Sequence, residues 1–387
     1  MRQNKGFLLK EINHVSYLLP YGQMIADQKR GLQLNTTGVY LWKLLEQDYT
    51  LKELISCSAT YYKISPSDMD EFSADITSFV NQLLAYGIII ENDTGHSPSM
   101  DTLSLSIGGL GLQLIGDSHA FPAAFHAFVQ NDTPQIHQKI LFQTGSPSIR
   151  ENGLVLLRNS ELVVLEVAEK YILLFPQSGS IREIHLNKSG DFAVCYCNPP
   201  YHEAFHYDIF HALRLVYLYL AQKMGMVALH SASLLYKGKA WLFSGHSGMG
   251  KSTHTNLWKE LYRITLLNGD LNLLGCDHGQ PMVHGIPWCG TSEIYSTQSL
   301  PLGGIILLNQ ASCNRVEELS KDRKQLLISQ RLISPAWTIS MFEQNMNIVE
   351  NIEPSILVCK LHCTKEYSAA KTIKSYIDYY LSNSNHE

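Results

Sequence analysis

The sequence lacks the features of several common classes of protein. Acidic residues (35 Asp and Glu) outnumber basic ones (30 Lys and Arg), which gives a formal net charge of -5, whereas a nucleic-acid-binding protein usually carries a basic excess. No apolar run reaches the length of a transmembrane helix. The first residues, MRQNKGFLLKE, contain no apolar segment like that of a secretory signal. We therefore expect no nucleic-acid partner, no membrane span and a cytoplasmic location.

The eight cysteines form neither a CxxC pair nor an even disulfide framework. Cys195 and Cys197, and Cys359 and Cys363 with His362 between them, have spacings that occur in metal sites. Both groups lie in alternating apolar runs that are typical of strands, so buried free thiols are the better interpretation. The length of 387 residues, with 45% hydrophobic content, allows two or three ordinary cores.

What the sequence does contain is a glycine-rich segment, LFSGHSGMGKSTHTNLW, at residues 242–258. Gly245, Gly250, Lys251 and Ser252 match the pattern G-x-x-x-x-G-K-[ST], between an apolar run and a helix-compatible run, which is the strand–loop–helix context that the motif requires. Glycines bring backbone N–H groups close to phosphate oxygens, and the helix N-terminus adds free N–H groups and its dipole. The pattern therefore predicts a site for a nucleoside triphosphate, with Lys251 at the outer phosphates and the Ser252 hydroxyl on Mg²⁺. The residues expected to bind the nucleotide are Gly245, His246, Ser247, Gly248, Met249, Gly250, Lys251, Ser252 and Thr253.

The hydrophobic pattern divides the chain into an N-terminal unit (1–92), a linker (93–102) and a larger domain (103–387). The N-terminal unit shows two short β-like runs and three helical patterns, which together suggest a winged-helix-like module. Its second helix is expected to begin with a capping box made by Thr50 and Glu53, and its third helix with Ser67 as the cap. The expected fold class is α+β or α/β, with this module followed by a mixed-sheet domain.

The larger domain is expected to have three parts. A β-rich part (103–200) carries short strands with turn signals, which predict a largely antiparallel sheet. The nucleotide-site core (201–320) begins with an amphipathic helix, and two strands then lead into the glycine-rich loop. The C-terminal part (321–387) is expected to hold helices at 321–333, 335–351 and 366–381 and a strand at 356–363.

Asp270 is the best candidate for the carboxylate that phosphoryl transfer requires. It follows the apolar run Ile264–Leu267, where the end of the next strand should approach the loop. A simple turn aspartate in the sequence NGD is the alternative, and the glycine-rich loop upstream favours the functional interpretation. By spacing alone, His230 would be structural.

Two further segments can be explained by a structural role as well as by a functional one. Asp277 and His278 look like residues of a hairpin turn. The loop GIPWCGTSEIY (285–295) is equally consistent with a lid over the substrate, in which Glu293 makes a polar contact, and with a rigid corner.

Part of the larger domain resembles the HPr kinase/phosphorylase-like proteins, which share their fold with phosphoenolpyruvate carboxykinases. The similar stretches, within about residues 200–320, are LHSASLLYKGKAWLFSGHSGMGKSTHTNLW, LLNGDLNLL, GIPWCG, PLGGIILL and NRVEEL. The resemblance implies that His230 is an active-site residue, that Ser252 and Asp270 hold the metal, and that Asp270 also activates the acceptor hydroxyl. The protein kinases of this family carry two adjacent acidic residues where this chain has Gly269-Asp270, so base and metal roles would fall on one carboxylate or be shared with His230.

The N-terminal unit resembles PqqD-like domains, the recognition elements of ribosomally made peptide natural products. The similar stretches are VSYLLP, LNTTGVYLW and DITSFVNQLLAYGIII. The resemblance implies that a leader peptide is added as a strand in a groove between a β-edge and the third helix, around Phe72–Tyr86.

Together these expectations describe an ATP- and Mg²⁺-dependent kinase of a Ser or Thr hydroxyl on a precursor peptide, with the leader held by residues 1–92 and with Asp270, His230 and Lys251 as catalytic residues. The resemblance also hints at a homo-oligomer. The alternatives are a kinase of a small molecule or carrier protein, a non-catalytic ATP-binding scaffold, and a phosphoenolpyruvate carboxykinase-type enzyme. The last ranks lowest because the sequence shows no added set of metal ligands and no arginine cluster.

Overall fold

The chain folds into two compact units, Met1–Ser97 and Pro98–Glu387. The computed structural model describes residues 1–26, 31–90, 101–130, 135–147, 151–201, 203–246 and 248–383. The expected linker (93–102) lies outside these residues except for its last two, which begin a strand. Among the described residues, every helix is too short or too polar to cross a membrane.

The described residues of the N-terminal unit form two small sheets and four helices. Its strands form a three-stranded antiparallel sheet, in the order β2-β3-β4, and a separate pair, β1-β5. Their bounds are β1 (Arg2–Gln3), β2 (Phe7–Ile12), β3 (Val15–Pro20), β4 (Leu32–Leu34) and β5 (Ile89–Ile90). The helices are α1 (Gln23–Ala26), α2 (Thr36–Leu44), α3 (Leu51–Tyr62) and α4 (Met69–Ala85). The two predicted β-like runs are β3 and β4, whereas β2 and the pairing of β1 with β5 were not predicted.

Helix caps explain where these helices begin. The capping box of Thr50 and Glu53 is confirmed at the start of α3. The predicted cap of the third helix is wrong, because Asp68 is the N-cap residue of α4 and the hydroxyl of Ser67 is hydrogen-bonded to the Asp68 carboxylate instead. Helix α2 is capped by Asn35, whose side chain accepts a hydrogen bond from the backbone N–H of Gly38.

In the described part of the second unit, the strands form two eight-stranded sheets. The first has the strand order β6-β7-β8-β13-β12-β11-β10-β9, and only its β7–β8 and β8–β13 pairs are parallel, so the predicted largely antiparallel sheet is confirmed. Its strands are β6 (Asp101–Ile107), β7 (Leu110–Gly116), β8 (Ile136–Thr144), β9 (Leu154–Arg158), β10 (Val163–Val167), β11 (Lys170–Leu174), β12 (Ile181–Asn187) and β13 (Phe192–Cys197).

The second sheet has the order β15-β14-β17-β18-β19-β21-β20, and β16 pairs with β14. Because β15 also pairs with β19, five of these strands (β14, β17, β18, β19 and β15) close a circuit. The strands are β14 (Val227–Tyr236), β15 (Lys239–Ser244), β16 (Leu266–Asn268), β17 (Leu271–Asp277), β18 (Gln280–His284), β19 (Ser299–Gln310), β20 (Arg315–Glu318) and β21 (Leu357–Cys363). Strand β16 corresponds to the end of the strand expected just before Asp270, whereas β20 was not predicted.

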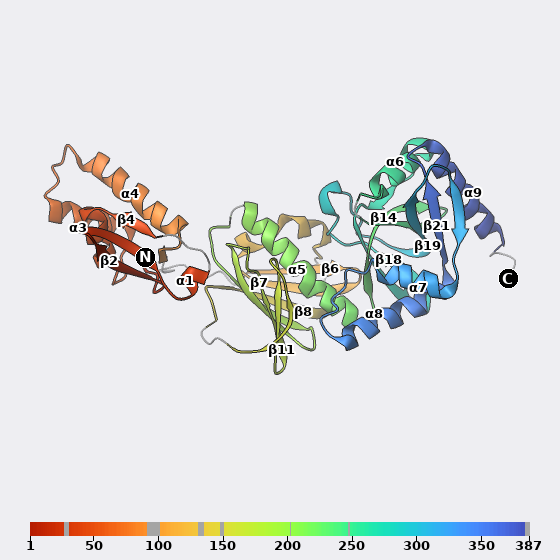
Figure 1. Ribbon diagram of the computed structural model, residues 1–387, viewed down its shortest axis with the longest axis horizontal. Coiled ribbons are helices and arrows are strands. Elements are labelled where there is room, and N and C mark those ends of the chain that lie inside the picture. The colour runs from red at the N-terminus through yellow and green to blue at the C-terminus, as the bar shows by residue number, and fades with distance from the viewer. Residues whose placement is uncertain are drawn as a thin grey trace. The chain divides into compact units, whose positions relative to one another are not determined.

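Helices cover both faces of this second sheet, as Figure 1 shows. On one face, α6 (Lys251–Tyr262) and α9 (Tyr367–Asn383) share a core with the strands. On the other face, α7 (Lys321–Ser329) and α8 (Ile339–Ile352) share a second core. Helix α5 (Glu203–Lys223) packs in a third core, to which both sheets contribute.

The predicted helix at 321–333 ends earlier than expected, at Ser329. The backbone N–H of His230 donates to the carbonyl of Arg331, and the N–H of Ile333 donates to the carbonyl of Ala228. Residues 331–333 are therefore hydrogen-bonded to β14 and cannot continue the helix. This contact brings the segment after α7 close to the strand that precedes β15.

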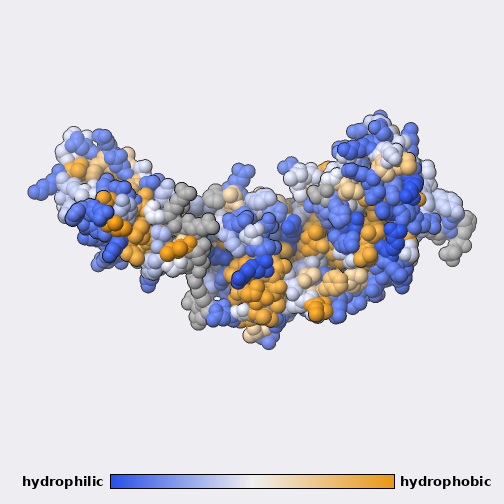
Figure 2. Space-filling model, viewed as in Figure 1, coloured by the Kyte–Doolittle hydropathy of each residue, from blue (hydrophilic) through white to orange (hydrophobic). Residues whose placement is uncertain are grey.

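An exposed sheet edge marks one further surface of the second unit. Strand β9 ends the first sheet, and its Leu154 and Val155 are 67% and 44% exposed. Apolar side chains gather on the visible face over the end of the sheet that holds β11 (Figure 2). An exposed apolar edge of this kind is typical of an interaction surface, and the homo-oligomer stays a prediction.

One histidine of α6 is buried against the neighbouring strands. His254 is 3% exposed, its ring stacks on Phe243 at a centroid distance of 4.9 Å, and neither ring nitrogen has a hydrogen-bond partner among the residues that the structure describes. Burial lowers the pKa of His254 to about 4.

We expect this histidine to make the folded state less stable in mild acid. The unfolded chain takes up a proton near the ordinary pKa of about 6.5, whereas the folded chain does so only near 4, so stability should fall by about 3 kcal/mol between these pH values. Urea unfolding at pH 7 and pH 4.5 should show this loss reduced in His254→Phe. The exposed-site control His126→Gln should keep it, and an unchanged pH dependence in His254→Phe would contradict the assignment.

Candidate functional site

The glycine-rich segment forms the loop between β15 and α6. Gly248 and Gly250 have φ values of +80° and +93°, which lie in the left-handed region that favours glycine, and Gly250 is the N-cap residue of α6. The N–H of Met249 donates to the carbonyl of His246, and the side chain of Gln310 donates to the carbonyl of Gly248. The expected nucleotide-binding residue at position 247 lies outside the described residues.

Strand pairing places this loop at the meeting point of several strand ends. Strand β15 is parallel to β19, which is parallel to β21, so the carboxyl ends of all three strands lie at one edge of the sheet. On its other side, β15 is antiparallel to β14, and Ser244 pairs with Ser231. This register sets His230 beside the start of the loop.

Three side chains from three elements form a continuous chain at this point. The Lys251 Nζ atom lies 2.7 Å from Nε2 of His230 and 3.3 Å from the carbonyl oxygen of Gly245. On the other side of the imidazole, His230 Nδ1 lies 3.3 Å from Oδ1 of Asp270. The structure therefore brings together Lys251, His230 and Asp270, the three residues predicted to be catalytic.

The surroundings of this chain favour the neutral form of its histidine. Burial lowers the pKa of His230, and the nearby Lys251 ammonium lowers it further, although Asp270 opposes both effects. Burial also lowers the pKa of Lys251. A neutral imidazole can accept a hydrogen bond from Lys251 at Nε2 only if its proton is on Nδ1, which faces Asp270.

The backbone around Asp270 is held by hydrogen bonds on both sides. Its carbonyl accepts from the N–H of Ser231, and its N–H donates to the side-chain oxygen of Asn268. Asn268 in turn donates to the carbonyl of Ile286 and receives a hydrogen bond to its side-chain oxygen from the N–H of Leu271. The residue at position 270 is thus fixed beside His230 rather than placed on a free turn.

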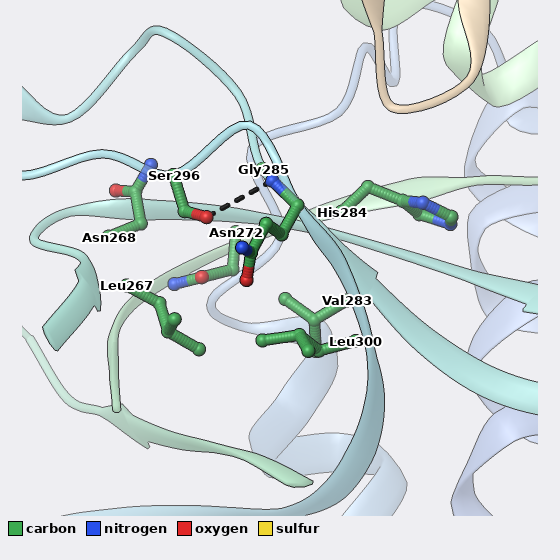
Figure 3. Close-up of a pocket in the computed structure, with 9 residues that line it drawn as sticks. Leu267, Asn268, Asn272, Val283, His284, Gly285, Ser296 and Leu300 are labelled. Carbon is green, nitrogen blue, oxygen red and sulfur yellow. Dashed lines mark hydrogen bonds between the residues drawn. The ribbon is translucent and has the colours of Figure 1, made fainter. Parts of the chain in front are cut away.

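A small hollow lies next to this support, lined by residues of β16, β17 and β18 and of the segment up to β19. In Figure 3, Leu267, Val283 and Leu300 gather on one side of the hollow, and His284 points away from them. Asn272 donates to the carbonyl of Ser231 and accepts from another serine hydroxyl, so its polar groups are used within the protein. The loop residues do not line this hollow, and we interpret it as part of the support for the site.

Two arginines that the sequence analysis did not single out extend the positive charge around the chain. Arg331 is 8% exposed, its Nη1 donates to the carbonyl of Leu327, and its Nε has no partner among the described residues. The Nε of Arg214 on α5 is also buried and without a partner in the described part of the chain. Burial lowers the pKa of Arg214, and the charge of Asp270 partly offsets that effect, so the two groups lie within electrostatic range.

Only one of these arginines leaves a signal in the sequence. Arg214 interrupts an otherwise apolar helical run, HALRLVYLYLAQ, and an unexplained charge in such a run is a reason to look for a function. Arg331 lies in an irregular segment, and no local pattern marks it.

The space that an acidic side chain at position 269 would need is filled by Ser292. A Cβ atom at Gly269 would collide with the Cβ and Oγ atoms of Ser292 in the 3₁₀ turn Gly290–Ser292. Ser292 is itself held, because its hydroxyl donates to the carbonyl of Cys289. Gly290 lies against Asp270, since a Cβ there would be 2.9 Å from the Asp270 Cβ. Glycine at 269 is therefore part of the packing.

The loop at 285–295, for which a lid and a rigid corner were equally expected, packs against α5 through Trp288. Trp288 is 2% exposed, and its indole N–H donates to the carbonyl of Phe210 on α5. Glu293, the predicted polar contact, follows the 3₁₀ turn and is exposed. Asp277 and His278 lie at the turn between β17 and β18, as predicted, with side chains 68% and 98% exposed.

The cysteines follow the plainer interpretation. Cys195, Cys197, Cys359 and Cys363 are free thiols in strands and are buried. Among the described residues, no group of three or more His, Cys, Asp and Glu side chains is arranged to hold a metal ion.

Residues 23–89 match the family model for Coenzyme PQQ synthesis protein D (PqqD). This segment is a PqqD domain. The match begins after β3, although β2 and β3 pair in one sheet with β4 inside the PqqD domain. The resemblance of the N-terminal unit to PqqD-like domains is thus confirmed.

Among solved structures, the HPr(Ser) kinase/phosphatase from Coxiella burnetii is similar to the chain at 11% identity with a TM-score of 0.24. The match covers 41% of this chain and 98% of that chain. At this identity and TM-score the similarity carries no argument about activity. No curated protein matches the chain in sequence.

The close packing of Gly269 against Ser292 in the second unit can be tested by substitution. Gly269→Asp should lower the free energy of unfolding by about 1–3 kcal/mol, because the new side chain has no space. The double variant Gly269→Asp with Ser292→Gly should recover part of this loss, which a double-mutant cycle in urea would measure.

A neutral control separates crowding from charge repulsion with Asp270. Gly269→Asn has nearly the same shape and should lose stability and be rescued in the same way. If Gly269→Asp alone is as stable as the unmodified chain, the packing argument is wrong.

Proposed function

We propose that the chain is an ATP-dependent kinase that transfers a phosphoryl group to a Ser or Thr hydroxyl of a ribosomally made precursor peptide, whose leader is held by the N-terminal unit. The observation that carries the proposal is the chain Lys251–His230–Asp270, which runs from the glycine-rich loop to a carboxylate. It connects the Lys251 ammonium, which can bind phosphate, with the Asp270 carboxylate, which can accept the proton of a hydroxyl.

The charges around the loop support a polyanionic ligand. Asp270 lies within electrostatic range of Lys251 and Arg214, Arg331 lies within range of Lys251, and burial lowers the pKa of all three cations. Buried cations without anionic partners are costly and rare. Phosphate oxygens would satisfy them, together with the free N–H groups and dipole at the N-terminus of α6.

The residues present fit Mg²⁺. Ser252 is exposed at the start of α6, and the Asp270 carboxylate is 37% exposed. Mg²⁺ is usually held by one or two carboxylates plus substrate phosphates and waters rather than by an all-protein cage. Ser252 and Asp270 would supply two oxygen ligands, and the ion would neutralise charge on the phosphates during transfer.

The remaining chemistry falls on side chains of this chain. Asp270 would take the proton of the acceptor hydroxyl while the hydroxyl oxygen forms a bond to the γ-phosphorus. The bond between the γ-phosphorus and the oxygen that bridges it to the β-phosphate breaks at the same time, which releases ADP. His230, with its proton on Nδ1, would orient the carboxylate. Lys251 would exchange its hydrogen bond to His230 for the phosphate oxygens, where it offsets the charge of the transferred group.

The PqqD domain supports a peptide as the acceptor. Strand β4 is an edge of the three-stranded sheet, and an extended peptide can add to such an edge. Leu34 of β4 and Phe79 of α4 both lie against Gly38, each 3.2 Å from the position of a Cβ there, so edge and helix approach one another. A leader bound at this edge would raise the effective concentration of the attached acceptor.

A non-catalytic scaffold that binds ATP and presents a peptide is the second candidate. The packing of Ser292 into the space beside Gly269 favours it, because only one carboxylate is left for the metal and the proton. Mg-ATP binding and peptide binding with no transfer would establish this alternative.

We expect Lys251→Ala and Asp270→Asn to separate binding from chemistry. Lys251→Ala should weaken Mg-ATP binding at least about tenfold, because it removes a cation from the phosphates, whereas Asp270→Asn should keep most binding and lose about 10²–10⁴-fold in transfer. Calorimetry would measure binding, and mass spectrometry would measure phosphorylation of the peptide encoded beside this chain's gene. The exposed control Asp277→Asn should retain both, and full transfer by Asp270→Asn would refute the mechanism.

Removal of residues 1–95 should abolish high-affinity peptide binding and leave Mg-ATP binding intact, because the two units are separately compact. Fluorescence anisotropy with a labelled peptide would measure the first and calorimetry the second. Unchanged peptide affinity would contradict the role of the N-terminal unit. Transfer that survives the deletion would point to a kinase of a small molecule or carrier protein.

A further inference from the structure

Helix α5 carries one arginine on the face that packs against the segment near Asp270. Phe210, Arg214 and Tyr217 are spaced i, i+4 and i+7, so they follow one another along this face. The ring centroid of Trp288 lies 5.6 Å from that of Phe210 and 5.1 Å from that of Tyr217, and its indole N–H donates to the carbonyl of Phe210. Arg214 therefore occupies the helix position between the two residues that Trp288 contacts.

The segment around Trp288 leads directly to the carboxylate of Asp270. A Cβ on Gly290, two residues after Trp288, would lie 3.1 Å from the Oδ2 atom of Asp270. The Oδ1 atom of the same carboxylate lies 3.3 Å from Nδ1 of His230. One oxygen thus faces the histidine that connects to the glycine-rich loop, and the other faces the turn that packs on α5. The charge of Asp270 acts on Arg214, so the two groups lie within electrostatic range of each other.

The guanidinium of Arg214 has hydrogen-bonding capacity that the described residues leave unused. Among these residues, Arg214 takes part in no hydrogen bond and no ion pair, and its Nε atom is buried without a partner. A long side chain that only reaches for solvent would explain unbonded outer nitrogens, but not a buried Nε atom without an acceptor. The two outer nitrogens are not buried, so a ligand can reach them. The side chain is therefore placed near Asp270 without being used by it.

The direction of phosphoryl transfer decides which side of the reaction Arg214 faces. The attacking and leaving oxygens lie roughly in line on opposite sides of the transferred phosphorus. The glycine-rich loop and Lys251 would hold the leaving side, whereas Oδ2 of Asp270 faces the turn that packs on α5. The face of α5 that carries Arg214 continues to Tyr207, which is 65% exposed, so this side is open to an incoming acceptor.

We propose that Arg214 is a further catalytic residue, whose guanidinium contacts the phosphoryl group from the acceptor side during transfer. This inference rests on the proposed function and adds a charge where the loop and Lys251 do not reach. The charge of the transferred group is spread over three equatorial oxygens, and a planar guanidinium can donate two parallel hydrogen bonds to such oxygens. A contact that is stronger in the transition state than in bound ATP raises kcat rather than the affinity for ATP.

Steady-state kinetics on the full chain tests this role. With Mg-ATP and the peptide encoded beside this chain's gene, Arg214→Gln should lower kcat about 10²–10³-fold, the usual effect of losing one donor to a developing oxyanion. The KM values for ATP and peptide should stay within about threefold. Arg214→Lys keeps the charge but loses the planar fork, so it should recover only part of kcat. The control Lys223→Ala removes an exposed positive charge from the last turn of the same helix and should keep kcat within about twofold.

A binding measurement that needs no turnover separates a catalytic role from a structural one. Mg-ADP with aluminium fluoride mimics the nucleotide together with the group in transfer. In calorimetry with the peptide present, aluminium fluoride should tighten the binding of Mg-ADP to the unmodified chain at least about tenfold, as expected of a transition-state analogue. Arg214→Gln should lose most of this gain, while its affinity for Mg-ATP and its thermal unfolding midpoint stay close to those of the unmodified chain.

The outcomes distinguish the two levels of the proposal. If the unmodified chain shows neither transfer nor any gain from aluminium fluoride, the proposed function fails and the role of Arg214 fails with it. If the unmodified chain phosphorylates the peptide and Arg214→Gln does so with unchanged kcat, only the role of Arg214 is overturned. A raised KM for the peptide at unchanged kcat would also overturn it, because Arg214 would then bind an acidic group of the acceptor. Arg214→Lys keeps the test decisive if Arg214→Gln does not fold.

Discussion

The pairing of β14 with its neighbours is the constraint on which the candidate site depends. Ser231 of β14 pairs with Ser244 at the end of β15, and the N–H of Ser231 donates to the carbonyl of Asp270. The hydroxyl of Ser244 donates to the carbonyl of His230. His230 is therefore held between the loop and the carboxylate by bonds on both sides of one strand. A register shift of one residue would turn its side chain to the opposite face of the sheet and disconnect Lys251 from Asp270.

Buried polar side chains lock this register. Asn272 donates to the carbonyl and hydroxyl oxygens of Ser231 and accepts from the hydroxyl of Ser233, which in turn accepts from the N–H of Asn268. The side-chain oxygen of Asn268 then accepts from the N–H of Asp270. A network this closely paired specifies one arrangement of strands, because an alternative register would leave buried amides and hydroxyls unsatisfied. The support of the carboxylate is thus a property of the sheet rather than of the NGD turn.

The sequence predicts local features well and misses those that depend on pairing. The glycine-rich loop follows from spacing within one segment, and the capping box of Thr50 follows from a residue three positions on. The position of His230 beside Lys251 follows from strand pairing between β14 and β15, which is why spacing alone did not select it. The end of α7 at Ser329 and the packing of Ser292 against position 269 were missed for the same reason, because the deciding partner lies in a distant segment.

The surroundings of Asp270 determine what a single carboxylate can do here. Its Oδ1 atom faces the Nδ1 of His230 at 3.3 Å, and its Oδ2 atom lies 3.1 Å from the position of a Cβ on Gly290. Because the 3₁₀ turn is anchored through Trp288 to α5, it cannot retreat to admit a second acid without disturbing a packed aromatic cluster. The positive charge of Arg214 approaches from the same helix. Among the described residues, Lys251 and Arg214 thus bring positive charge within range of this carboxylate, and the anionic ligand proposed above would add negative charge at the same point.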